Sequence, residues 1–246
     1  MDVEVIAVKL SGAQIRGMLV FSAGAALSYR VVVAPLVRRW GATDEEVARP
    51  MPGDEFAPTP MLRGNHAITI AAPPEDIWPW LLQIGYGRAG FYSYERLEQM
   101  MGLTGIENSD RIIPEFQQLK VGDLVPFGPG PNAGLSVLAL TPNRQLALGT
   151  RDEKGAISWS FGLYPIDARQ TRLVSRNLAY MPDWTYGKIL RSPSRWRTEL
   201  PMKLFMNLGG LLMVRKMLLG IKARAERLQR QEVTDEAVLA LSSGCE

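Results

Sequence analysis

The densest group of polar side chains that could do chemistry lies at 108–115. It comprises Asn108, Asp110, Arg111 and Glu115. Two carboxyl groups in an apolar cleft can act as an acid–base pair, because burial raises a carboxyl pKa. The same residues can instead build a turn, with Asn108 and Asp110 capping it and Arg111 paired with a carboxylate. Both interpretations stay open, and Asn108, Asp110 and Arg111 form the candidate polar site.

A glycine pattern provides a second chemical candidate. Gly85, Gly87 and Gly90 match the G-x-G-x-x-G spacing of dinucleotide sites, and Glu107 lies downstream. The pattern binds a pyrophosphate only where it follows a strand and opens a helix. Here the preceding residues have helical apolar spacing, and no second β-α-β unit follows. The sequence therefore predicts a tight loop between two helices and no nucleotide or other cofactor.

The sequence gives little support for a metal site or for a catalytic nucleophile. The chain contains one histidine, His66, and one cysteine, Cys245. It therefore lacks the His/Cys cluster of the usual zinc sites, and no Ser-His pair is indicated. No disulfide within the chain is possible. His66 begins a predicted strand, where we expect a half-exposed residue, so no catalytic or metal-binding residue is assigned.

The elements that must position these groups begin with an alternating strand at 66–70. A helix with an aromatic face follows over 75–82. Strands separated by turns come after residue 122, including a hairpin that turns at 141–144. At 156–164 large apolar side chains alternate with small ones, which predicts an antiparallel strand with one buried face. This order indicates a mixed α+β domain.

A long helix is predicted from about 200 to 230. Its apolar residues recur in steps of three and four. Gly209 and Gly210 lie inside it, and each lowers helix propensity by about 1 kcal/mol relative to alanine. That cost indicates either a kink or a close approach of the backbone to a ligand. The polar tail at 231–246 is expected to be disordered.

This order of elements resembles the START-like, or SRPBCC, superfamily, which includes birch-pollen allergens and polyketide cyclases. Residues 68–78 are similar to its strand-into-helix opening. Trp159-x-Phe161-x-Leu163 and Thr171-Arg172-Leu173 resemble its last two strands. Residues 108–115 look like an uncharacterised bacterial branch whose members often carry an N-terminal hydrophobic segment. The resemblance covers 63–230 and implies the helix-grip fold, in which an antiparallel sheet curves around a long C-terminal helix and leaves an apolar cavity.

The resemblance also implies which residues line that cavity. Aromatic residues after the glycine loop border its mouth, although ordinary core packing remains the alternative for them. We expect Trp159 and Phe161 to face Leu208 and Leu212 across the interior. The full predicted lining set is Phe91, Tyr92, Tyr94, Trp159, Phe161, Ser175, Asn177, Phe205, Leu208 and Leu212.

Three classes of function follow. The favoured one is non-catalytic binding of a hydrophobic small molecule or lipid in the cavity. The rival is a cyclase- or dehydratase-like enzyme that uses Tyr, Asp or Arg groups there. An interaction module with a filled core is the third. Polar side chains that converge inside the cavity would favour the enzyme, and an apolar wall would favour the carrier. The sequence does not indicate an oligomeric state.

The N-terminal region shows a membrane signal. Residues 17–36 carry a single charge, Arg30, and are long enough to span a bilayer as a helix. A helix at 14–38, after a short segment at 1–13, is therefore either a membrane anchor or a helix packed on the domain or a partner. The basic residues that follow it favour a cytoplasmic domain. The proline-rich connector at 39–62 is expected to act as a semi-rigid spacer.

The charge distribution is uneven. The net charge is +3, but residues 188–230 hold eleven basic residues and two acidic ones. Such a region could face anionic lipid headgroups, and a solvated helix face is the simpler alternative. No DNA- or RNA-reading motif is present, so no nucleic-acid partner is predicted.

Overall fold

The computed structural model describes residues 11–13, 17, 20, 24, 31, 34–100, 102–153, 155–180 and 196–243, with side chains of the last helix described over 208–231. The chain divides into two compact units, 1–37 and 38–246. Most of the hydrophobic helix predicted at 14–38 lies outside the described residues, and α2 spans Ala34–Arg38. Among the residues described, no helix has the length and apolar character needed to cross a membrane.

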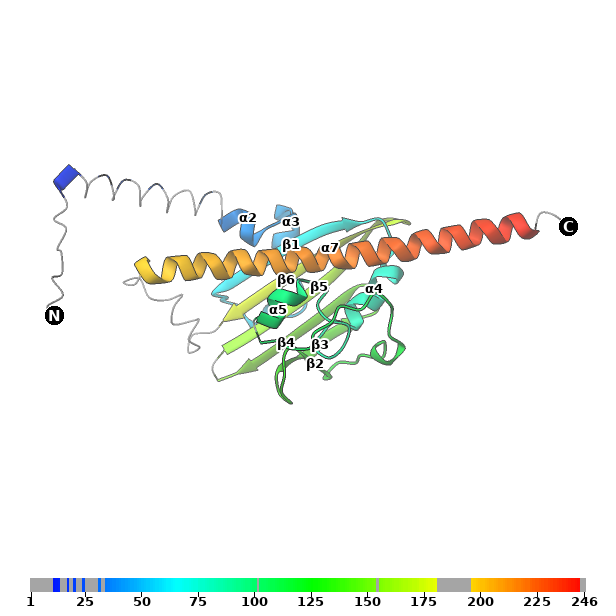
Figure 1. Cartoon of the computed structure of the whole chain (residues 1–246), viewed down its shortest axis with the longest axis horizontal. Coiled ribbons are helices and arrows are strands. Elements are labelled where there is room, and N and C mark those ends of the chain that lie inside the picture. Colours follow the sequence, from blue (N-terminus) through cyan, green and yellow to red (C-terminus); the bar gives the residue numbers. More distant parts are fainter. Residues whose placement is uncertain are drawn as a thin grey trace, which may run out of the picture. The chain divides into compact units, whose positions relative to one another are not determined.

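The second unit is built on a six-stranded antiparallel sheet with the strand order β1-β6-β5-β4-β3-β2 (Figure 1). The strands are β1 (Leu62–Ile70), β2 (Leu124–Pro126), β3 (Gly134–Thr141), β4 (Gln145–Asp152), β5 (Gly155–Asp167) and β6 (Gln170–Tyr180). The predicted hairpin is present between β3 and β4. Its turn places Asn143 at φ 58°, a left-handed conformation that asparagine tolerates.

Helices lie around this sheet. They are α3 (Asp44–Ala48), η2 (Asp54–Phe56), α4 (Pro74–Leu82), α5 (Glu95–Met100), η3 (Pro114–Phe116) and α7 (Trp196–Ser243). The predicted helix over 75–82 is therefore confirmed as α4. The glycine loop follows α4, and a single antiparallel bridge joins Gly85 to Gly90. It is a tight loop between two helices, as predicted.

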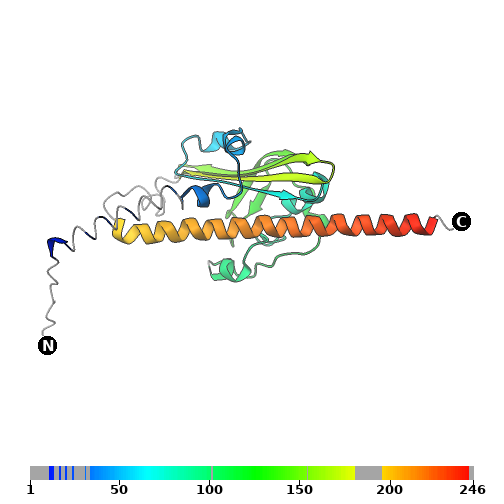
Figure 2. The same cartoon turned by 90° about the horizontal axis from the view of Figure 1, so that it is seen from above.

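The long helix α7 runs across one face of the sheet, called the inner face from here on (Figure 2). This arrangement confirms the predicted α+β helix-grip fold. The helix continues through Gly209 and Gly210 without a break. It also extends to Ser243, so the prediction of disorder beyond 231 is wrong over most of that tail.

The inner face holds the main core. Trp159, Phe161 and Leu163 of β5 are buried there, which confirms the predicted alternation on that strand. Leu218 and Ile221 of α7 are fully buried in the same apolar cluster. The second half of the predicted apolar stripe therefore packs on the sheet.

The outer face of the sheet is covered by residues 39–61, which corrects the prediction of a spacer. Met51 is buried in an apolar cluster against β1 and β6, and Ala57 in a second one against β5 and β6. Ser158 and Ser160, the small residues of β5 that point outward, are 1% exposed as a result. Strand β5 therefore has two buried faces rather than one, and the domain begins before residue 63.

Two arginines on the outer face of β6 hold this segment. Arg176 is 1% exposed; its guanidinium pairs with Asp54 at 2.6 Å and donates to the Asn65 side-chain oxygen at 2.7 Å. It also donates to the backbone carbonyls of Glu46 and Val47, each at 3.0 Å. A buried guanidinium is tolerated only when it is paired and hydrogen-bonded in this way. Residues 46–54 are therefore an integral part of the fold.

The second arginine, Arg172, binds helix α3. Arg172 forms an ion pair with Glu46 at 2.6 Å. The first turn of α3 has a capping box, in which Thr43 and Glu46 each accept a hydrogen bond from the backbone N–H of the other. Although burial alone would raise it, hydrogen bonds from Arg172 and from the Thr43 backbone lower the pKa of Glu46 below its usual value.

Candidate functional site

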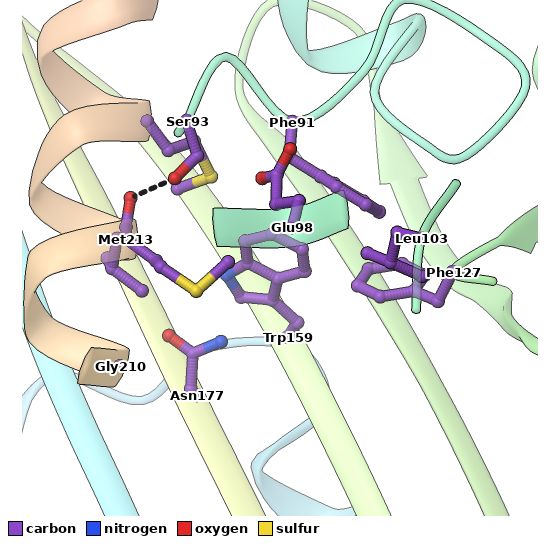
Figure 3. A pocket seen from close by; sticks show the side chains of 11 residues that line it. Phe91, Ser93, Glu98, Leu103, Phe127, Trp159, Asn177, Gly210 and Met213 are labelled. Carbon is purple, nitrogen blue, oxygen red and sulfur yellow. Dashed lines mark hydrogen bonds between the residues drawn. The ribbon is translucent and has the colours of Figure 1, made fainter. Parts of the chain in front are cut away.

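An apolar cavity of about 290 Å³ lies between the inner face of the sheet and α7 (Figure 3). This volume is at the small end of the range of about 300–1,000 Å³ that is typical of ligand pockets. The sheet, α7 and the segment around α5 each contribute part of the wall. The lining residues are Phe91, Ser93, Glu98, Leu103, Phe127, Trp159, Asn177, Gly210, Met213, Val214 and Met217.

One wall of the cavity is a chain of aromatic rings. The ring centroids of Phe91 and Phe127 are 5.0 Å apart, and those of Phe127 and Trp159 are 5.3 Å apart. Phe161 packs behind Trp159 at 5.0 Å, in the core. The Trp159 indole N–H donates to Ser175 Oγ at 3.0 Å, and Ser175 is fully buried. Ser175 therefore orients Trp159, while Trp159 itself faces the cavity.

Helix α7 forms the opposite wall of the cavity, but with a different face from the one predicted. Gly210, Met213 and Met217 line the cavity. Leu208 and Leu212 are 37% and 51% exposed, so their predicted place in the interior is wrong. The reason is helical phase, since 3.6 residues per turn put Leu212 about 140° from Met217. The side chain of Phe205 lies outside the described residues.

Gly210 is exposed and lies at the open side of the cavity lining. A Cβ atom built at Gly210 would have no atom within 4 Å, and the same holds for Gly209. Close protein packing therefore does not require glycine at either position. Only Gly210 lines the cavity, so a side chain there would project toward the ligand space.

Two of the three predicted aromatic residues after the glycine loop do not line the cavity. Tyr92 is 1% exposed, and its hydroxyl donates to the Trp80 carbonyl at 3.1 Å. Its backbone has φ 56° and lies against Gly220 of α7, where a Cβ would be 2.6 Å from the Tyr92 carbonyl oxygen. Tyr94 is 43% exposed, with Lys216 5.7 Å from its ring centroid. Phe91 alone of the three reaches the cavity.

The candidate polar site is structural and lies outside the cavity. Asn108 binds the turn at 92–95: its side-chain oxygen accepts the Tyr92 N–H, and its amide donates to the Ser93 carbonyl at 3.2 Å. Asp110 is 72% exposed and pairs with Arg224 of α7 at 2.8 Å. Arg111 is exposed and lines, with Asp110, a separate hollow. The acid–base interpretation of these residues is therefore wrong.

Of the predicted lining set, Phe91, Trp159 and Asn177 line the cavity; among the lining residues that were not predicted, Glu98 is the ionisable one. It reaches from α5 into the cavity and is 0% exposed. In the view of Figure 3 its carboxyl group lies between Ser93 and Phe91. Neither carboxyl oxygen has a hydrogen-bond partner among the described residues. Burial, assisted by the like charge of Glu95, raises the pKa of Glu98 to about 7.

The remaining polar groups of the cavity are few. The Ser93 hydroxyl donates to the Met213 carbonyl at 3.2 Å. The Asn177 side-chain oxygen is buried and, within the described part of the chain, has no partner. His66 is 5% exposed rather than half-exposed, because its strand partner Ser175 and the inner face around it are covered. Within the same described part, no group of three or more His, Cys, Asp or Glu side chains could hold a metal ion.

Glu98 could not be recognised from local pattern. Helix α5 reads Glu-Arg-Leu-Glu-Gln-Met, in which Glu95 and Glu98 stand three residues apart as on an exposed helix face. What buries Glu98 is the placement of this short helix at the cavity, whose wall also includes residues of α7 and β5, and that is a tertiary effect. The cavity is therefore an apolar chamber with one ionisable group.

No family model matches the chain, and no curated protein matches it. Several solved structures resemble it. One is a polyketide cyclase-like protein of Corynebacterium glutamicum, at 14% identity and TM-score 0.38, covering 72% of this chain and 95% of that one. Another is a Thermobifida fusca protein, at 14% identity and TM-score 0.40, covering 68% of this chain and 94% of that one.

A third is a norcoclaurine synthase point mutant of Thalictrum flavum in complex with a transition-state analogue, at 13% identity and TM-score 0.35, covering 68% of this chain and 96% of that one. The fold assignment itself rests on the strand order and on the position of α7.

Proposed function

We propose that this protein binds a hydrophobic small molecule or lipid in the cavity between the sheet and α7, without catalysing a reaction. The observation that carries the proposal is the cavity wall, which is formed mainly by aromatic rings, methionines and Leu103. Methionine side chains adapt to irregular ligand shapes. The enzyme alternative needed Tyr, Asp or Arg groups in the same cavity, and Tyr94, Asp110 and Arg111 all lie elsewhere.

Filling the cavity from Gly210 is expected to weaken ligand binding by at least tenfold without weakening the fold. Gly210→Leu places a branched side chain in the ligand space, and it should raise helix stability by about 1 kcal/mol. Gly209→Leu makes the same change of residue type one position away, outside the cavity lining. Titration with the fluorescent probe N-phenyl-1-naphthylamine measures binding, and thermal unfolding measures stability.

The expected result is saturable binding by the wild type and by Gly209→Leu, and at least tenfold weaker binding by Gly210→Leu. Equal binding by all three proteins would place the probe outside this cavity. Absence of binding by the wild type, at concentrations that the probe's solubility allows, would count against the proposed function.

We also propose that the protein is associated with a membrane through the segment at 17–36, with its domain on the cytoplasmic side. The supports are the length of this run, its single charge and the arginines at 38 and 39. We expect the full chain in the membrane fraction of cells and a chain lacking residues 1–36 in the soluble fraction. Recovery of the full chain without detergent would contradict an anchor.

A further inference from the structure

The cavity presents unpartnered hydrogen-bond acceptors. The Glu98 carboxyl oxygens and the Asn177 side-chain oxygen are buried without partners among the described residues. The donors of Ser93 and Trp159 are already engaged, with the Met213 carbonyl and Ser175 Oγ, and the Asn177 amide is the remaining donor of the described wall. In the view of Figure 3, Glu98 and Asn177 lie above and below Trp159. A ligand that complements this wall is apolar and carries a hydrogen-bond donor.

The described part of the chain supplies no positive charge that pairs with Glu98. No described ion pair involves Glu98. Arg224 and Arg227 are directed to Asp110, at 2.8 and 3.8 Å, and Lys216 lies over the Tyr94 ring. The charge that acts on Glu98 is that of Glu95, which is repulsive. An ionised carboxylate buried in this way is costly unless a cation joins it.

We infer that the cavity takes a small apolar molecule that carries a protonated amine, and that Glu98 binds the amine as its counter-ion. This inference rests on the proposed function, since it names the class of ligand for the same cavity. A charge-assisted N–H···O bond between ammonium and carboxylate is about twice as strong as a neutral one. The aromatic wall of Phe91, Phe127 and Trp159 would hold the apolar body of the molecule.

The Glu98 carboxyl group would reach a ligand by a change of its own side-chain conformation. Its oxygens are shielded in the unliganded chain, but the side chain itself lines the cavity. Rotation about its terminal bonds would bring the oxygens to the ligand space, because the rest of the side chain already lines it. The amine then provides the partner that the shielded oxygens lack.

A matched set of ligands tests the inference. 4-Phenylbutylamine, 4-phenylbutan-1-ol and 4-phenylbutyrate share one apolar body and differ in the terminal group. Each is measured at pH 8 by its displacement of N-phenyl-1-naphthylamine from the wild type, Glu98→Gln and Gly209→Leu. We expect the wild type to prefer the amine over the alcohol by at least tenfold and to bind the carboxylate most weakly. Glu98→Gln should lose the preference for the amine, and Gly209→Leu should keep it.

The pH dependence is a second readout. Among the described residues that line the cavity, Glu98 is the only titratable one, and Glu95 on the same helix is the charged group that acts on it. Amine affinity in the wild type should therefore fall about tenfold for each pH unit below 7, as Glu98 takes up a proton, while alcohol affinity stays level. Binding of probe and alcohol without any preference for the amine would overturn the inference and leave the proposed function standing. Failure of every ligand and of the probe would instead remove the proposed function.

Discussion

A chain that lacks residues 1–61 is expected not to fold, whereas a chain that lacks residues 1–36 is expected to fold. The longer deletion removes Asp54 and the carbonyls of Glu46 and Val47, which satisfy the buried guanidinium of Arg176. It also uncovers the outer face of β5. Circular dichroism during thermal unfolding measures the result, and a cooperative transition is expected only for the shorter deletion.

A single substitution in the same segment tests the same contacts with a smaller, measurable loss of stability. Asp54→Ala leaves Arg176 buried with one fewer partner, which should lower the free energy of unfolding by about 2 kcal/mol. This loss is smaller than for a fully buried ion pair, because Asp54 is partly exposed. Asp44→Ala is the control, since Asp44 pairs with Arg39 at the surface and is 91% exposed. Equal stability of the two variants, or a folded chain without residues 1–61, would show that the segment is the spacer predicted from sequence.

Replacing Glu98 by glutamine is expected to stabilise the protein at pH 8 by about 3 kcal/mol, on the basis of about 1.4 kcal/mol per pKa unit. In the unfolded chain Glu98 loses its proton near its ordinary pKa of 4.5, but in the folded chain only near 7. The folded state therefore binds more protons between these values, so wild-type stability falls as pH rises from 4.5 to 7. Glutamine mimics the protonated form at every pH and avoids that loss.

Thermal unfolding from pH 4.5 to pH 8 measures this effect. The melting temperature of Glu98→Gln should exceed that of the wild type by about 6–12 °C at pH 8, and the difference should vanish toward pH 4.5. Glu115→Gln is the control, because it removes one carboxylate from the exposed surface. It shows how much of the change in melting temperature comes from the loss of a negative charge alone. A difference between Glu98→Gln and the wild type that does not vary with pH would contradict burial of an unpaired carboxyl group.

The sheet could be predicted from sequence because its signal is local. Alternation along 156–164 placed Trp159 and Phe161 on the inner face, and turn residues at 141–144 marked the hairpin. The helix α7 was predicted for the same reason, but its rotation was not. Steps of three and four describe a stripe that drifts around the helix, so Leu208 belonged to the pattern without belonging to the core. Leu212, which lies next to that stripe, was expected inside as well, and it is exposed.

What could not be predicted depends on contacts between distant segments. The prolines at 50, 52, 58 and 60 indicated an extended path, and an extended path can be either a spacer or a cover for the sheet. Between Ala156 and Tyr164 the outward face of β5 consists of serines and glycine, a composition typical of a solvent-exposed face, and only the placement of residues 39–61 shows that it is covered. Glu98 was missed in the same way, because a short helix with two acidic residues is ordinary on a surface and unusual inside a cavity.

The measurement that tests the central claim most directly is a crystal structure of the chain with N-phenyl-1-naphthylamine. The proposal predicts electron density for the probe between Phe127, Trp159 and Met213, with its edge against Gly210. Density only on the surface, or a cavity filled by rearranged side chains at saturating probe concentration, would contradict a ligand-binding function for this cavity.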